Sequence, residues 1–462
     1  MTDSFVNIVY LIAASLFILG IKGLTRPRTA VRGNMLSASG MLIAIVVTLF
    51  DKHILSYEWI IGGIVLGSII GTILATRIQM TAIPQMVALL NGFGGGASLG
   101  VAVANYFQGG FATDMTGTIT LLAIGATILI GAVTLTGSLV AFGKLQEIIS
   151  GQSIGFPGMK LLNALLLATA LYAIVMVIIN PADVSWIYVM IAASCLLGLF
   201  LVLPIGGADM PVVIALLNSY SGIAAASAGF IMGNTVLIVT GSLVGASGII
   251  LTRIMCVAMN RSLFNVLFGV MAEGGEKIDA DEVYAGKVKS TSSEEVAMML
   301  ETARRVVIVP GYGMAMSQAQ HAVREMANAI EAMGCVVEYA IHPVAGRMPG
   351  HMNVLLAEAE VPYDKLVEMD RINPTFEQTD VAIVIGANDV TNPMAREDKG
   401  SPIYGMPILN VDKARTVIVV KRSLSPGFAG LPNPLFAMDN TLMLFGDGKQ
   451  AILDITAALK EG

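Results

Sequence analysis

The chain has 462 residues, of which 55% are hydrophobic and only 13% are charged. This apolar content is too high for an ordinary soluble domain and predicts that part of the chain lies in a lipid bilayer. The formal net charge of −6 excludes a nucleic-acid partner, because binding to a phosphate backbone requires clustered cations. The three cysteines form no CxxC pair, which excludes a disulfide framework and a zinc site.

The charged residues are distributed unevenly. Residues 1–262 hold 10 Lys and Arg and 7 Asp and Glu, whereas residues 263–462 hold 17 and 26. We therefore predict a transmembrane domain at 1–262 and a water-soluble domain at 294–462. The polar, acidic stretch between them, at 263–293, is interpreted as a linker or hinge.

Nine apolar runs of bilayer-spanning length precede residue 262. The first has no cationic segment before it and is too long for the core of a signal peptide, so we interpret it as a span. The predicted spans are 4–23, 34–50, 57–76, 84–106, 117–143, 160–180, 184–204, 210–232 and 234–258.

Basic residues gather at one side of these spans. The cations on that side are Lys22, Arg26, Arg28, Arg32, Arg77, Lys144, Lys160, Arg253 and Arg261, and the other side offers only Lys52. Because basic flanks stay in the cytoplasm, we predict an outside N-terminus and a cytoplasmic C-terminal domain.

Small and polar residues interrupt the apolar runs. Gly63, Gly67 and Gly71 recur at every fourth position, as do Gly241 and Gly245, a spacing typical of close helix packing. Polar groups at membrane depth are costly and mark candidate functional positions. They are Asn91, Asn218, Ser219, Ser247 and, at one membrane edge, Asp209.

Two interpretations of Asp209 remain open. It directly precedes the eighth span and Pro211 follows it, so it could simply cap a helix. It could equally exchange protons at the cytoplasmic mouth of a proton path. Asn91 and Asn218 cannot titrate, so they would hold water or bond across helices.

The soluble part alternates strands and helices. Ser292 and Glu295 form a capping-box pattern at the start of a helix that reaches about Arg304. Buried strands are predicted at 306–309, 336–341, 381–385, 416–420 and 441–445, with a helix at 316–333. Unalternating β-branched strands separated by helices predict an α/β Rossmann-like domain, with a parallel sheet covered by helices on both faces.

A glycine-rich turn follows the first of these strands. Gly311, Gly313 and Ala315 fit the G-x-G-x-x-A pattern between a strand and a helix. Such glycines let the backbone approach a pyrophosphate, which the helix N-terminus attracts. The turn therefore predicts dinucleotide binding.

Other residues favour NADP(H) over NAD(H). The second strand ends in Ile341-His342-Pro343, without the carboxylate that usually bonds the ribose of NAD. Lys421 and Arg422 follow the fifth predicted strand and would suit a 2′-phosphate, although they could also be solvated surface cations. Loops at 344–351 and 386–389 end two more strands and are either ordinary turns or further parts of the site.

The chain resembles the beta subunit of bacterial proton-translocating NAD(P) transhydrogenase over essentially its whole length. The most telling stretches are 206–213, 217–222, 259–262, 310–315, 342–356, 386–389 and 421–423. The resemblance implies that this chain binds NADP(H) and that a separate alpha subunit binds NAD(H). Hydride would pass directly from NADH to NADP⁺ while protons cross the bilayer, in a dimer of alpha–beta units.

The resemblance also assigns residues. Segments that match the family's NADP contacts contribute Tyr312, Val344, Ala345, Gly346, Arg347, Met348, Pro349, Gly386, Ala387, Asn388, Asp389, Val390, Gly405, Met406, Lys421, Arg422, Ser423, Leu424, Ser425, Pro426, Gly427, Phe428, Asp447 and Gly448. In the membrane part, Asp209, Asn218 and Gly248 match positions implicated in coupling. Two departures are Phe428, where some relatives have Tyr, and Asn91, where many have a protonatable His.

No protein acid or base is expected to act in the hydride step. Direct transfer between two nicotinamides requires only that the two rings are placed together. The rival hypothesis is a channel or transporter gated by a nucleotide-sensing Rossmann domain, which would need no second nicotinamide.

Overall fold

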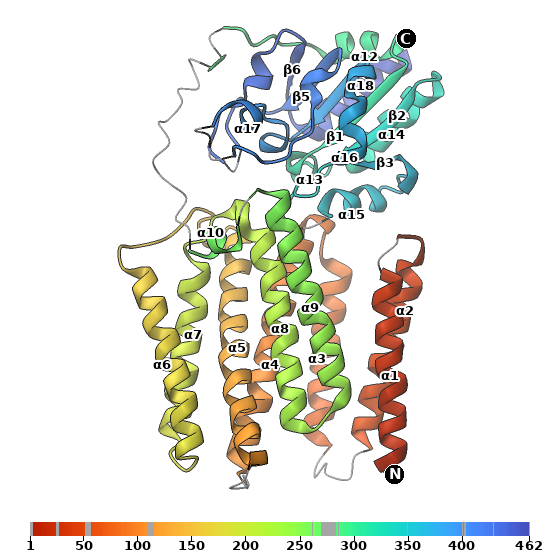
Figure 1. Cartoon of the computed structure of the whole chain (residues 1–462). Helices are drawn as coiled ribbons and strands as arrows, with labels where there is room; N and C mark the ends of the chain where they lie inside the picture. Colours follow the sequence, from red (N-terminus) through yellow and green to blue (C-terminus); the bar gives the residue numbers. More distant parts are fainter. Residues whose placement is uncertain are drawn as a thin grey trace. The chain divides into compact units, whose positions relative to one another are not determined.

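The computed structural model describes residues 3–24, 27–50, 57–109, 115–260, 262–268, 283–284, 286–348, 350–399, 401, 403–427 and 429–461. The chain forms two compact units (Figure 1). One consists mainly of the apolar helices before residue 253, and the other consists mainly of residues 253–462.

Within the described residues, nine helices are long and apolar enough to cross a bilayer, as predicted. They are α1 (Asp3–Leu24), α2 (Pro27–Leu49), α3 (Glu58–Arg77), α4 (Ile83–Gln108), α5 (Met115–Leu145), α6 (Met159–Ile179), α7 (Ser185–Val202), α8 (Met210–Met232) and α9 (Thr235–Ala258). The largest difference from the predicted ends is in α2, which begins at Pro27 rather than near residue 34. Arg28 and Arg32 therefore lie within this helix and not before it.

The glycine-spaced helices behave in two ways. A Cβ on Gly241 or Gly245 would meet α8, at Ala226 and Ile223 respectively, so the predicted close packing of α9 is confirmed. The glycines of α3 face open space, and no described residue of α3 is buried. The same sequence pattern thus serves helix contact in α9 but contacts nothing within the described part of this chain in α3.

The soluble unit contains a six-stranded parallel sheet. Its strands are β1 (Arg305–Pro310), β2 (Val336–Ile341), β3 (Leu366–Glu368), β4 (Val381–Ile385), β5 (Thr416–Lys421) and β6 (Thr441–Phe445), in the order β3-β2-β1-β4-β5-β6. The five predicted strands are confirmed. The edge strand β3 was not predicted, because three residues are too few to show a pattern.

The two faces of this sheet are covered differently. On one face lie α12 (Ser293–Glu301), α14 (Gln320–Ala332), α15 (His351–Glu358) and α18 (Gly448–Glu461). The other face is covered by the short segments α16 (Met369–Ile372), η4 (Asn373–Gln378), η6 (Val411–Lys413) and η7 (Pro434–Ala437). Both faces are therefore covered by helical segments, as predicted, but the longer helices lie on one face only.

Two helix predictions are refined. The capping box of Ser292 and Glu295 is present, but α12 ends at Glu301 rather than near Arg304. The helix predicted at 316–333 is divided into α13 (Tyr312–Met316) and α14, and Gln318 between them has a positive φ of 50°. A non-glycine residue in that region ends a helix.

Part of the predicted linker belongs to the soluble unit. Residues 263–268 form α10 (Leu263–Phe268), and residues 269–282 lie outside the described residues. Further on, Tyr284 is buried. The backbone N–H of Thr291 donates to the carbonyl of Met443 in β6, and the N–H of Met443 donates to the carbonyl of Lys289. The stretch from Lys289 to Thr291 thus runs beside β6 and covers that edge of the sheet.

Candidate functional site

The two loops that end β1 and β4 are locked together by their glycines. The N–H of Gly311 donates to the carbonyl of Ile385 and that of Gly313 to the carbonyl of Gly386, both at 2.9 Å. A Cβ on Gly311 would overlap Ala387, and one on Gly313 would lie 2.6 Å from the Cα of Gly386. These glycines therefore join the two loops, and their N–H groups are bonded within that junction. Their role in letting the backbone approach a pyrophosphate stays a prediction.

His342 connects the loop after β2 to a second loop. Its Nδ1 accepts from the N–H of Val344 at 3.2 Å, which leaves Nε2 to donate to the carbonyl of Pro407 at 2.8 Å. Burial lowers the pKa of His342 to about 4, and the bond to Pro407 opposes that shift. This neutral ring thus connects Val344 to the loop that contains Gly405 and Met406. Val344, Gly405 and Met406 are all predicted site residues.

The next turn of this loop is built around His351. The Nδ1 of His351 accepts from the N–H of Arg347 at 3.0 Å, and a Cβ on Gly346, whose φ is +106°, would overlap that ring. The guanidinium of Arg347 lies over the ring of Tyr312, 4.6 Å from its centroid. Burial, and secondly the charge of Arg347, lower the pKa of His351 to about 4. Pro349 lies outside the described residues.

The neighbouring cations after β5 have different surroundings. The ammonium of Lys421 donates to the carbonyls of Ser423 and Ser425 and lies over the ring of Phe436. Burial lowers its pKa, and the carboxylate of Asp389 opposes that shift. Arg422 is exposed, and no bond from its side chain to another described residue is found. Of the predicted pair, only Arg422 thus presents its charge outward.

Asp389 contacts the segment on both sides of the predicted site residue Phe428. Its Oδ2 accepts from the N–H of Ala429 at 3.0 Å, and a Cβ on Gly427 would lie 2.6 Å from its Oδ1. Phe428 itself lies outside the described residues. The carboxylate of Asp389, in the loop after β4, thus bonds the chain on one side of Phe428 and lies close to it on the other.

Sequence reasoning missed two buried asparagines beneath these loops. Asn433 donates from Nδ2 to the carbonyl and to Oδ1 of Asn388, both at 3.1 Å. Asn392 donates to the carbonyl of Pro432 at 3.0 Å and accepts from the N–H of Met394. Each precedes a proline, which signals a turn, but the partner loop 40 or more residues away cannot be inferred from that signal.

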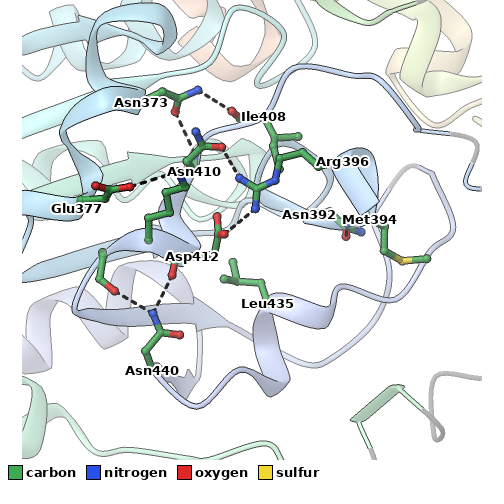
Figure 2. Close-up of polar contacts among 12 residues, drawn as sticks. Asn373, Glu377, Asn392, Met394, Arg396, Ile408, Asn410, Asp412, Leu435 and Asn440 are labelled. Carbon is green, nitrogen blue, oxygen red and sulfur yellow. Dashed lines mark hydrogen bonds and ion pairs between the residues drawn. The ribbon is translucent and has the colours of Figure 1, made fainter. Parts of the chain in front are cut away.

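A polar network fixes the chain that returns to β5 (Figure 2). Arg396, on α17 (Met394–Glu397), donates to Oδ1 of Asn410 and Oδ2 of Asp412, each at 2.6 Å. Asn373 donates to the carbonyl of Ile408 and accepts from the N–H of Asn410. The network holds the segment that follows Gly405 and Met406 and contains Leu409, whose N–H bonds the carbonyl of Val390.

The remaining predicted residues of this unit have structural surroundings. Asp447 accepts from the N–H groups of Lys449 and Gln450 and so caps α18. A Cβ on Gly448 would lie 2.7 Å from Oγ of Ser317. Ala315, the last residue of the glycine-rich turn pattern, is fully buried. Leu424 is partly buried, whereas Ser423, Ser425 and Pro426 are exposed.

In the membrane unit, some of the predicted polar residues join helices. Asn91 on α4 donates to the carbonyl of Ile214 on α8 at 3.3 Å. Ser219 on α8 donates to the carbonyl of Gly245 at 2.7 Å, and a Cβ on Gly248 would lie 2.7 Å from the nitrogen of Ser219. Asn218 precedes Ser219 and is partly buried.

Two other predicted residues of the membrane part stand apart from these contacts. Ser247 is exposed and donates to the carbonyl of Val244 in its own helix, so it joins no second helix. Asp209 is buried and ends the turn η2 (Gly207–Asp209), directly before α8. Its place in the chain fits a helix cap and leaves the second interpretation open.

The helices and the sheet define a class: a multi-pass membrane protein that carries a doubly wound α/β domain. Residues 6–458 match the family model described as NAD(P) transhydrogenase beta subunit. The chain is 48% identical over 466 residues to NAD(P) transhydrogenase subunit beta of Rhodospirillum rubrum, covering 99% of this chain and 100% of that protein. The protein of the same name from a defined strain of that species matches equally well.

The chain therefore belongs to the NAD(P) transhydrogenase beta subunit family, and the resemblance predicted from its motifs is confirmed. It is a subunit of an enzyme, which favours the transhydrogenase hypothesis over the nucleotide-gated channel.

Proposed function

We propose that this chain binds NADP(H) and, with an alpha subunit that binds NAD(H), couples hydride transfer from NADH to NADP⁺ to proton movement across the membrane. The observation that carries the proposal is the convergence of loops at the carboxyl ends of β1, β2, β4 and β5. Strand order reverses between β1 and β4, and ligands of open α/β sheets bind where it does.

Arg422 is proposed to bind the 2′-phosphate. It is exposed beside a site in which the neighbouring cation, Lys421, is already bonded to loop carbonyls. A guanidinium can bond two phosphate oxygens at once, which an ammonium cannot do as specifically. The missing carboxylate at the end of β2, where His342 stands, supports the same choice of dinucleotide.

The residues around the site hold and orient the nucleotide rather than exchange protons with it. Bound NADP(H) supplies the position that accepts or donates the hydride. His342 and His351 are neutral near pH 7 because burial lowers the pKa of each to about 4. Both imidazole rings hold loop backbone in place. This supports a site that acts only by positioning the nicotinamide ring.

Proton coupling is proposed to involve Asp209 and the polar contacts of α4, α8 and α9. Asn91 cannot carry a proton, so in this chain the carboxylate of Asp209 is the titratable candidate among the predicted residues. The excess of basic residues on one side of the helices supports an outside N-terminus, a cytoplasmic α/β domain and an inner-membrane location. A dimer of alpha–beta units completes the proposal.

Co-expression with the cognate alpha subunit and reconstitution in vesicles tests this function. NADP⁺ reduction by NADH should proceed only with both subunits present and should speed up when a proton gradient is applied in the driving direction. If nucleotide binding altered ion flux while no NADPH formed, the nucleotide-gated channel would replace the proposed function.

A further inference from the structure

A buried lysine lies at the end of α5, outside the residues proposed to bind the nucleotide. Lys144 is in the last turn of α5 and is only 3% exposed. Its ammonium donates to the carbonyls of Leu203 at 2.6 Å, Ile205 at 2.7 Å and Gln152 at 3.0 Å. An ammonium has three N–H donors, and all three are used here.

This arrangement is that of a fixed cation. A buried charge is costly unless its hydrogen bonds are satisfied, and three carbonyl dipoles satisfy this one. Loss of the proton would remove one donor and leave a buried carbonyl without its bond, which costs further free energy. The carbonyl cage therefore favours the permanently charged form over a group that releases protons in each turnover.

The backbone at 203–205, between α7 and α8, accepts two further hydrogen bonds. Oγ of Ser153 donates to the carbonyl of Pro204 at 2.5 Å, and the N–H of Ile154 donates to the carbonyl of Leu203 at 3.2 Å. Three consecutive carbonyls, at 203–205, thus accept hydrogen bonds from the end of α5 and from the segment that follows it. We call these contacts the clamp. An ordinary loop would leave such groups to water.

The clamped carbonyls lie directly before the segment of Asp209. α7 ends at Val202, the clamp covers 203–205, and the turn of Gly207–Asp209 leads into α8. We infer that Lys144 is a positioning residue for proton coupling, because its carbonyl-bound ammonium fixes the backbone of residues 203–205, which leads along the chain into the turn of Asp209. The inference rests on the proposed function and adds to it a residue outside the nucleotide site and outside the predicted polar residues of the membrane part.

The test uses the complete alpha–beta enzyme in vesicles. We would measure the membrane potential generated per hydride transferred, and NADPH affinity, for wild type, K144M and the control K160M, whose lysine is exposed on α6. In K144M most of the potential per hydride should be lost, while NADPH affinity stays that of wild type. In K160M neither quantity should change. An unchanged potential per hydride in K144M would overturn the inference.

Rescue distinguishes the clamp from general damage. In K144A, n-propylammonium replaces the missing side chain and should restore the potential per hydride, whereas tetramethylammonium, which has no N–H donors, should not. A membrane potential is read because permeant amines dissipate a pH gradient. Equal effects of the two ions, or none, would contradict the carbonyl cage.

Two further arms keep the outcome decisive. S153A removes only the bond to Pro204 and should lower the potential per hydride in the same direction as K144M but less. If K144M failed to assemble, an unaltered S153A together with no rescue of K144A would reject the inference. If the wild-type enzyme transferred hydride without generating a potential, the proposed function itself would fail, independently of Lys144.

Discussion

At the scale of single residues, Lys421 and Arg422 show how neighbours in the sequence can differ in role. The ammonium of Lys421 is used by the backbone of its own loop, so it shapes the loop. The guanidinium of Arg422 is exposed and is available to a ligand. The two substitutions should therefore have distinguishable effects.

We predict that R422A weakens NADPH binding by about 1.5–3 kcal/mol, the range of a hydrogen bond to a charged group. The binding of NADH, which lacks the 2′-phosphate, should change little. K421M should instead weaken both, because the loop loses its shape. Titration of the full-length chain with each nucleotide measures these effects, and an equal loss of both nucleotides in R422A would show that Arg422 does not bind the phosphate.

A second residue-scale prediction concerns pH. The pKa of His351 is about 4 in the folded chain against 6.5 as its ordinary value, so the unfolded chain binds more protons between these limits. The contribution of His351 is complete above about pH 6.5 and is lost as the pH falls toward 4, by about 3 kcal/mol in all.

Thermal unfolding of the full-length chain across this range measures the loss. H351N keeps an acceptor for the N–H of Arg347 but does not titrate, so its stability should fall less steeply with acid than that of wild type. H321N, at an exposed position on α14, is the matched control and should follow wild type. Parallel curves for wild type and H351N would contradict the prediction.

At the scale of elements, the crossing of the β1 and β4 loops is the joint that shapes the candidate site. We predict that G313A destabilises the soluble unit by about 1–3 kcal/mol, because its Cβ would lie 2.6 Å from Gly386 and overpack the crossing. G446A is the control, since its Cβ would lie 3.7 Å from its nearest neighbour. Denaturant unfolding compares the two, and a G313A variant as stable as G446A would show that the crossing tolerates separation.

The same elements show what sequence patterns reveal. The membrane helices and the five longer strands were predictable, because bilayer thickness and burial on both faces impose patterns that lie within each segment. Strand β3 was too short to show one. The crossing of Gly313 with Gly386 and the bonds of Asn433 to Asn388 join distant segments, so no local pattern contains them. The candidate site residues were predicted from motifs and from the family resemblance, whereas their contacts required the fold.

At the scale of the whole molecule, the chain combines nine membrane-type helices, within its described residues, with a doubly wound α/β domain. Asn91 cannot titrate, so this chain's proton coupling is proposed to depend on Asp209 and on the backbone that presents it. The clamp of Lys144 offers a physical reason why that backbone is held in one conformation.

We propose that this chain by itself carries a site for the phosphorylated dinucleotide. The most direct test is a titration of the purified full-length chain, without any partner, with NADPH and NADH under identical conditions. NADPH should bind more tightly by at least about tenfold, the equivalent of 1.4 kcal/mol. Equal affinities, or a preference for NADH, would contradict it.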